Sequence, residues 1–116
     1  MSGIVLYHNP NCSKSRGALS ILEASDAAFE VVPYLDTPLD RDTLLKIIKL
    51  LPNDPAALVR KDKNFKELDL RPEDYTTREA VVSLLLEHPK LMQRPVILRG
   101  EKAVIARPSD KVLELL

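Results

Sequence analysis

The sequence has very little cysteine, glycine and aromatic character. Its 116 residues include one cysteine, three glycines and no tryptophan, and aromatic side chains make up only 4%. One cysteine cannot form an internal disulfide, so a reducing, cytoplasmic location is predicted. A core must be built from Leu, Val, Ile and Ala, and a hydrophobic content of 45% is enough to build one.

Neither sign of charge is in excess, because Lys+Arg and Asp+Glu number 17 each. This balance predicts no nucleic-acid partner and no binding to an anionic membrane surface. No apolar run approaches the roughly 18 residues that a membrane span needs. The N-terminus, MSGIVLYHNP, lacks the charged start of a signal peptide and has the pattern of a strand. We therefore expect a single cytoplasmic domain over residues 1–116.

Hydrophobic spacing predicts the order strand, helix, strand, several helices, strand, strand, helix. The first three elements are expected at residues 4–7, at about 13–24 and at 28–34. They form a βαβ unit with a parallel pair of strands. Residues 37–88 are predicted to be almost entirely helical. The segments PVIL and AVIA are predicted to form a hairpin at 95–106.

These elements predict an α/β fold in which a mixed four-stranded sheet is flanked by helices. The run at about 37–88 would be a helical insertion into that fold. The final segment, PSDKVLELL, places Pro108 before four apolar residues and predicts a closing helix. Those apolar residues are Val112, Leu113, Leu115 and Leu116.

Several residues in the insertion resemble helix caps. Either Thr37 or Asp40 could begin the first helix, and the sequence alone does not choose between them. Asp54 precedes a proline and is predicted to cap a short helix that ends at about residue 59. Thr76 and Glu79 have the spacing of a capping box at the start of a further helix.

The only cysteine lies in HNPNCSKSRG, between the first strand and the first helix. Cys12 is therefore expected at a helix N-terminus, where unpaired N–H groups and the helix dipole favour an anion. Lys14 and Arg16 add positive charge nearby, and Ser15 could donate a hydrogen bond to the sulfur. His8, at the end of the first strand, could either add charge that tunes the thiol or serve as a capping or packing residue. This combination predicts an activated thiolate rather than an inert buried thiol.

The residues around Cys12 exclude several kinds of thiol chemistry. A Cys-x5-Arg phosphatase loop would need arginine at Ala18, and a Cys-x-x-Cys centre would need cysteine at Ser15. One cysteine and two distant histidines do not support a metal site. Asn9 and Asn11 are most simply turn residues. The prediction is a monothiol centre at Cys12, whose resolving thiol must come from another molecule.

At this point the sequence resembles the glutaredoxin-dependent arsenate reductases, a branch of the thioredoxin-like fold. Four separated blocks carry the resemblance, and they are spread over nearly the whole chain with matching spacing. The blocks are HNPNCSKSR at 8–16, LVRK at 58–61, HPKLMQRPVI at 88–97 and ARPSDKVL at 106–113. The loop departs from the Cys-Gly-Thr-Ser-Arg typical of established reductases, because this chain has Cys-Ser-Lys-Ser-Arg.

The resemblance implies roles for individual residues. Cys12 occupies the nucleophile position, and His8 and Ser15 match residues that assist the thiolate. Pro95 matches a proline that is expected to be cis and to face the thiol loop. The family's three oxyanion-binding arginines correspond to Arg60, Arg94 and Arg107.

The activity implied is reduction of arsenate, or a similar oxyanion, through a bond between Cys12 and arsenic. Glutathione would be the co-substrate and glutaredoxin the protein partner, with no bound cofactor or metal. One alternative is a glutathione-dependent thiol oxidoreductase whose arginines hold glutathione carboxylates. Another is a redox-responsive regulator that binds RNA polymerase, and the presence of all three arginines disfavours it.

Overall fold

The computed structural model describes residues 3–116, and the chain divides into two compact units. One unit comprises the residues up to 37 together with 94–116, and it contains all four strands. We call it the sheet unit. The other comprises residues 38–93, its regular elements are helical, and we call it the helical unit.

The sheet unit is a mixed four-stranded sheet with strand order β2-β1-β3-β4. The strands are β1 (Ile4–His8), β2 (Phe29–Pro33), β3 (Val96–Arg99) and β4 (Lys102–Ile105). β1 pairs with β2 in parallel and with β3 antiparallel, and β3 and β4 form the antiparallel hairpin. The predicted fold class is therefore confirmed, including the parallel pair at the start of the chain.

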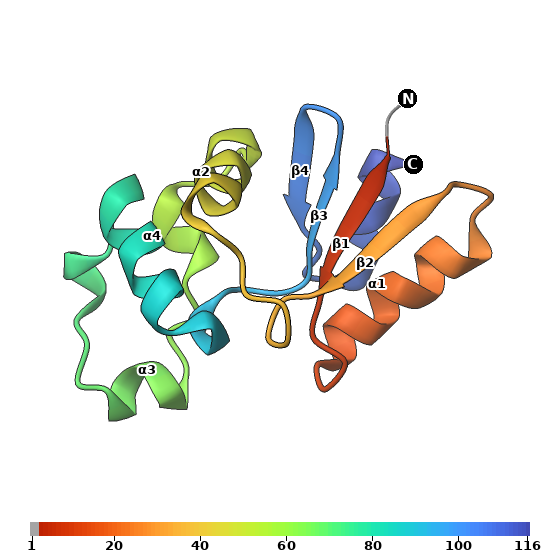
Figure 1. The fold of residues 1–116 in the computed structure, drawn as a ribbon. Helices are drawn as coiled ribbons and strands as arrows, with labels where there is room; N and C mark the ends of the chain where they lie inside the picture. The colour runs from red at the N-terminus through yellow and green to blue at the C-terminus, as the bar shows by residue number, and fades with distance from the viewer. Residues whose placement is uncertain (1–2) are drawn as a thin grey trace. The chain divides into compact units, whose positions relative to one another are not determined.

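Helix α1 (Ser13–Ala24) and the C-terminal 3-10 helix η4 (Ser109–Leu115) pack together beside the sheet (Figure 1). α1 begins and ends where the sequence predicts. Their shared core is apolar and draws on the three neighbouring strands β1, β3 and β4. It consists of Ile4, Leu6, Ala18, Leu22, Ile97, Val104, Ala106, Val112 and Leu115. This packing fixes the start of α1 relative to the C-terminal segment.

Gly17 lies inside α1, where glycine ordinarily destabilises a helix. A Cβ atom at this position would come within 2.6 Å of Ser109 Oγ and 3.0 Å of Ser109 Cβ. A larger residue would force the Ser109 side chain to shift, so glycine allows the close approach of η4 to the first half of α1.

The closing segment is a 3-10 helix rather than a regular α-helix. Val112 and Leu115 are buried, whereas Leu113 and Leu116 are exposed. A spacing of three residues places Val112 and Leu115 on one face of a 3-10 helix, since that helix has three residues per turn. Four clustered apolar residues predicted helix at this position but did not distinguish the two kinds.

The β3–β4 hairpin closes through a two-residue loop, Gly100–Glu101, because Arg99 pairs with Lys102. Gly100 has a φ of 61°, the left-handed conformation that glycine adopts without strain. A glycine of this kind at the first loop position is typical of a type II′ turn, which matches the twist of the two strands.

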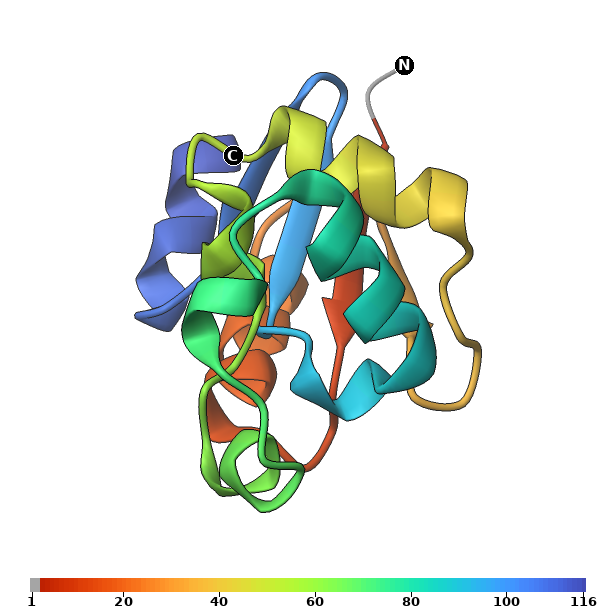
Figure 2. The same cartoon turned by 90° about the vertical axis from the view of Figure 1, so that its left-hand side faces the viewer.

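The helical unit contains α2 (Arg41–Leu50), α3 (Lys63–Glu67) and α4 (Arg78–Glu87). Figure 2 shows α2 in yellow and α4 in teal, and these two helices contact one another. The unit also has three short 3-10 helices: η1 (Pro55–Leu58) follows α2, η2 (Pro72–Asp74) follows α3 and η3 (Pro89–Leu91) follows α4.

The structure shows which of the predicted residues cap the helices of the helical unit. Asp40, not Thr37, caps α2, because its carboxylate accepts the N–H of Thr43 at 2.8 Å. Asp54 is the N-cap of a 3-10 helix, but its side chain makes no cap hydrogen bond.

The capping box predicted at Thr76 and Glu79 is wrong by one residue. Thr77 is the N-cap of α4, and its hydroxyl accepts the N–H of Ala80 at 3.2 Å. Glu79 is then one position too early to complete the box. It forms an ion pair with Arg41 at the start of α2 instead.

Candidate active site

The cysteine loop is a compact turn that leads from β1 into α1. The N–H of Cys12 donates to the carbonyl of Asn9 at 3.0 Å, and the N–H of Asn11 donates to Asn9 Oδ1 at 3.0 Å. The asparagine side chain closes a local turn, as the sequence analysis predicted for Asn9. Cys12 itself is the N-cap residue of α1 and has an extended backbone, with φ −102° and ψ 123°.

The buried polar residues of the described chain are His8, Asn9 and Ser15, which lie at the end of β1, in this loop and in the first turn of α1. His8 Nδ1 lies 2.6 Å from Ser15 Oγ, and the N–H of Asn9 donates to the same oxygen at 3.0 Å. Burial, and secondly the charge of Arg16, lower the pKa of His8, which keeps the imidazole neutral at pH 7. Nδ1 can then accept the hydroxyl proton of Ser15.

This network differs from the expectation for Ser15. Its hydroxyl was predicted to donate to the Cys12 sulfur, whereas in the described residues the hydroxyl bonds to His8 and Asn9. Ser15 influences the sulfur through its backbone N–H instead. The side chains of His8 and Ser15 thus hold the loop that presents the cysteine.

The Cys12 side chain is only 9% exposed, yet its environment favours the thiolate. Burial is the largest influence and raises the pKa, but it is outweighed by the backbone N–H of Ser15, the Arg94 side chain and the backbone N–H of Lys14. The net result is a Cys12 pKa of about 7, well below the ordinary 9.0. Cys12 makes no side-chain cap hydrogen bond, so the first-turn N–H groups stay available to the thiolate or to another anion.

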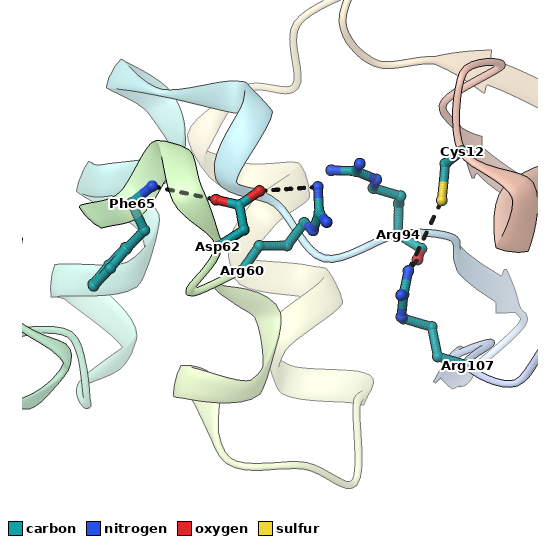
Figure 3. Close-up of polar contacts among 6 residues, drawn as sticks. All are labelled: Cys12, Arg60, Asp62, Phe65, Arg94 and Arg107. Atoms are coloured by element: carbon teal, nitrogen blue, oxygen red, sulfur yellow. Dashed lines mark hydrogen bonds and ion pairs between the residues drawn. The ribbon is translucent and has the colours of Figure 1, made fainter. Parts of the chain in front are cut away.

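Arg94 and Arg107 lie at the two open ends of the β3–β4 hairpin and are joined to one another (Figure 3). Arg107 Nη1 donates to the carbonyl oxygen of Arg94 at 2.9 Å and lies 3.9 Å from Cys12 Sγ. The N–H of Ala106 donates to the carbonyl of Pro95 at 3.0 Å, which extends the hairpin pairing toward the arginines. The two arginines and the cysteine, far apart in sequence, are thus brought together.

Both arginines precede proline, and both of these peptide bonds are cis. The cis bond before Pro95 is the one that the family resemblance implies, and the bond between Arg107 and Pro108 was not anticipated. Arg94 has one further feature. Its Nε is buried and has no hydrogen-bond partner within the part of the chain that the structure describes.

Arg60 belongs to the helical unit, where it follows η1. Its N–H donates to the carbonyl of Leu91 at 2.7 Å, and its Nη1 lies 3.2 Å from a carboxylate oxygen of Asp62 (Figure 3). Asp62 in turn caps α3 by accepting the N–H of Phe65 at 3.2 Å. The convergence of Arg60 on Cys12 stays a prediction.

Asp62 was missed by the sequence analysis as a partner of Arg60. The signal was available, because an aspartate directly before KNFKE is a typical N-cap and lies two residues after the arginine. Residues 3–116 contain no cluster of three or more His, Cys, Asp or Glu side chains that could hold a metal. Over the same residues, none of the helices is long and apolar enough to cross a membrane.

A cysteine at the N-terminus of the helix that follows the first strand, on a mixed four-stranded sheet, is the arrangement of a thiol protein of the thioredoxin-like fold. Residues 7–115 match the ArsC family, and the chain belongs to that family.

Individual relatives agree with this assignment. An arsenate reductase of Neisseria meningitidis serogroup A is 41% identical over 118 residues, which cover all of both chains. The Escherichia coli protein YfgD, described as uncharacterized, is 39% identical and covers 97% of this chain and 96% of its own. A solved structure described as an arsenate reductase from Vibrio cholerae has a TM-score of 0.88 at 36% identity. It covers 99% of this chain and 98% of its own.

Proposed function

We propose that this protein is an arsenate reductase in which the Cys12 thiolate is the nucleophile. The observation that carries the proposal is the sulfur itself, which has a pKa of about 7 and lies 3.9 Å from the guanidinium of Arg107. About half of the thiol is ionised at neutral pH with such a pKa. Relatives that bear the name arsenate reductase, at 41% identity and with a TM-score of 0.88, support the same activity.

Arsenate requires the cations because it carries about two negative charges at neutral pH, and a thiolate approaching it is repelled. Arg94 and Arg107 would neutralise the oxygens with planar, permanently charged donors. The buried Nε of Arg94, which lacks a partner among the described residues, is a donor suited to an oxyanion oxygen. We propose Arg60 as the third arginine of this set, and its Asp62 partner would hold its guanidinium.

In the proposed reaction, Cys12 is the only protein thiol of this chain that bonds to arsenic. The Cys12 thiolate displaces one arsenate oxygen, which leaves as water after protonation, and a Cys–S–As(V) bond forms. The thiol of glutathione then displaces a second oxygen and bonds to the arsenic. A glutaredoxin thiolate attacks the glutathione sulfur, and the electron pair of the S–As bond passes to arsenic and reduces it to As(III). The products are a glutaredoxin–glutathione mixed disulfide and, after hydrolysis, arsenite and free Cys12.

External reductants are part of the proposal because the chain has only one cysteine. No second thiol of the same chain can resolve the bond to arsenic, so glutathione and glutaredoxin are the co-substrate and partner that we propose. A compartment that keeps thiols reduced, such as the cytoplasm, would suit this chemistry. His8 and Ser15 would act by holding the cysteine loop, through the 2.6 Å contact between them.

The test is an arsenate-reduction assay with purified protein, glutathione and glutaredoxin. Arsenite formation should require all three and should disappear when Cys12 is replaced by Ser. Replacing glutaredoxin with thioredoxin, at matched concentration and with glutathione present, should give no turnover. Arsenite formation by the Cys12→Ser protein would remove this thiol from the mechanism.

A glutathione-dependent thiol oxidoreductase is the second candidate, and the cysteine loop gives it one specific observation. Lys14 and Arg16 are exposed on either side of Ser15, and such cations could hold the carboxylates of glutathione. This function predicts that a glutathionylated protein is a faster substrate than arsenate under identical conditions. Equal glutathione and glutaredoxin concentrations in both assays separate the two candidates.

A further inference from the structure

A hydroxyl group from the C-terminal segment bonds to the first turn of α1. Ser109 Oγ donates to the carbonyl oxygen of Lys14 at 2.8 Å, across 95 positions of sequence. Ser109 is half-buried and lies two residues after Arg107, whose side chain contacts the cysteine sulfur. The bond therefore joins the segment that carries an oxyanion-binding candidate to the turn that carries the thiol.

The carbonyl that accepts this bond is part of a particular peptide group. The C=O of Lys14 and the N–H of Ser15 belong to one planar unit, so their orientations are coupled. The N–H of Ser15 is also the group that most strongly favours ionised Cys12. A donor bonded to the carbonyl polarises the amide and strengthens its N–H as a donor, so Ser109 can influence the sulfur through this peptide group.

Gly17 makes this contact possible. A Cβ atom at position 17 would lie 2.6 Å from Ser109 Oγ, so any larger residue would displace the hydroxyl from α1. The glycine thus has a role connected with the first turn, in addition to allowing η4 to approach.

We propose that Ser109 is a positioning residue for the nucleophile, holding the Lys14–Ser15 peptide group with its N–H directed at the Cys12 sulfur, and that Gly17 provides the space for it. Ser109 contacts neither the sulfur nor the substrate in this role and acts through the peptide group. The inference rests on Cys12 being the reactive thiolate of the proposed function, but it does not depend on the identity of the oxyanion.

The experiment measures the rate of Cys12 alkylation by iodoacetamide between pH 5 and 10, and takes the midpoint of the pH profile. Ser109→Ala should raise that midpoint by about half a pH unit, the order expected when the hydrogen bond that polarises the peptide group is lost. The matched control is Ser25→Ala, because Ser25 Oγ donates to the carbonyl of Leu22 at 2.7 Å at the other end of the same helix. This control should leave the midpoint unchanged.

Gly17→Ala provides a second test, which does not remove the hydroxyl. It should raise the midpoint in the same direction as Ser109→Ala, and the double variant should show no further rise. An unchanged midpoint in both single variants would overturn the proposal. So would an equal shift in Ser25→Ala, because that would show a general effect of helix destabilisation.

Alkylation needs neither arsenate nor glutathione, so this result and the proposed function can fail separately. A shifted midpoint in a protein that does not reduce arsenate would support the role of Ser109 and reject the substrate. Arsenate turnover together with an unshifted midpoint would reject the role of Ser109 alone.

Discussion

The helices of the helical unit and helix α1 of the sheet unit begin in different ways. α2, α3 and α4 start at Asp40, Asp62 and Thr77, and each of these side chains accepts an N–H from the first turn. α1 starts at Cys12, which makes no such bond. In α2, α3 and α4 the capping side chain satisfies a first-turn N–H and stabilises the helix. Helix α1 leaves its N–H groups directed at a sulfur and available to an anion.

Replacing Cys12 with Ser should have the largest effect and should sharpen this contrast. Arsenate reduction should fall to background, because a serine alkoxide does not form at neutral pH. The same change converts Cys12 into a good N-cap, so the free energy of unfolding at pH 6 should rise by about 1 kcal/mol. Steady-state turnover and urea denaturation of both proteins measure the two effects. A protein that loses activity without gaining stability would show that the first turn lacks cap geometry.

Replacing Arg94 or Arg107 with Ala should weaken oxyanion binding. Each change removes charged hydrogen bonds, so KM for arsenate should rise about 10- to 100-fold. Arg71→Ala is the matched control, because Arg71 is exposed and pairs with Glu73 and Asp74 within the helical unit. Initial-rate kinetics at saturating glutathione give the comparison. If KM stayed the same in both variants, Arg94 and Arg107 would have no part in binding.

The pH dependence of stability tests the thiolate directly. The pKa of Cys12 is about 7 in the folded chain and the ordinary value is 9.0, so the unfolded state binds more protons between these values. The stabilisation is fully present above pH 9 and is lost as pH falls through 7. The free energy of unfolding should therefore increase by about 1.5 to 2 kcal/mol from pH 7 to 9, relative to Cys12→Ser. Parallel pH curves for the two proteins would contradict a lowered thiol pKa.

The smallest effect concerns an ordinary cap. Thr77→Ala should lower the free energy of unfolding by about 1 kcal/mol, because the N–H of Ala80 loses its acceptor. Thr76→Ala, one residue earlier, should change it little, and neither variant should alter the alkylation midpoint of Cys12. Urea denaturation monitored by circular dichroism measures both. A larger loss in Thr76→Ala would restore the capping box that the sequence predicts.

Local patterns predicted the elements and the thiol well. Ala18 and Leu22 on one face, after a polar turn, were enough to place α1 at 13–24. The apolar runs PVIL and AVIA on either side of RGEK placed the hairpin. The N-cap of α4 was assigned to the wrong residue because two threonines, Thr76 and Thr77, stand side by side. Residue type cannot choose between them, and only the backbone conformation shows that Thr77 is the cap. The 3-10 form of η4 depends on how Val112 and Leu115 meet the core, which the residue types alone do not reveal.

The contacts between residues of the site were harder to predict from the sequence. Composition and spacing do not distinguish Arg94 and Arg107 from other arginines, and only the family resemblance singled them out. Gly17 is unfavourable inside a helix, and no local pattern explains it, because the reason is Ser109, some ninety positions away. Contacts of this kind depend on the packing of η4 against α1, and no local rule contains them.

The link between Arg94 and Arg107 has a practical consequence. The two residues leave opposite strands of one hairpin and share a hydrogen bond, so a disturbance of that hairpin should move both guanidinium groups together. The Gly100–Glu101 loop lies at the far end of this hairpin (Figure 1), and both of its residues are exposed. A spectroscopic label attached at Glu101 could therefore report strain transmitted from a bound oxyanion, without any chemical modification of the groups that bind it.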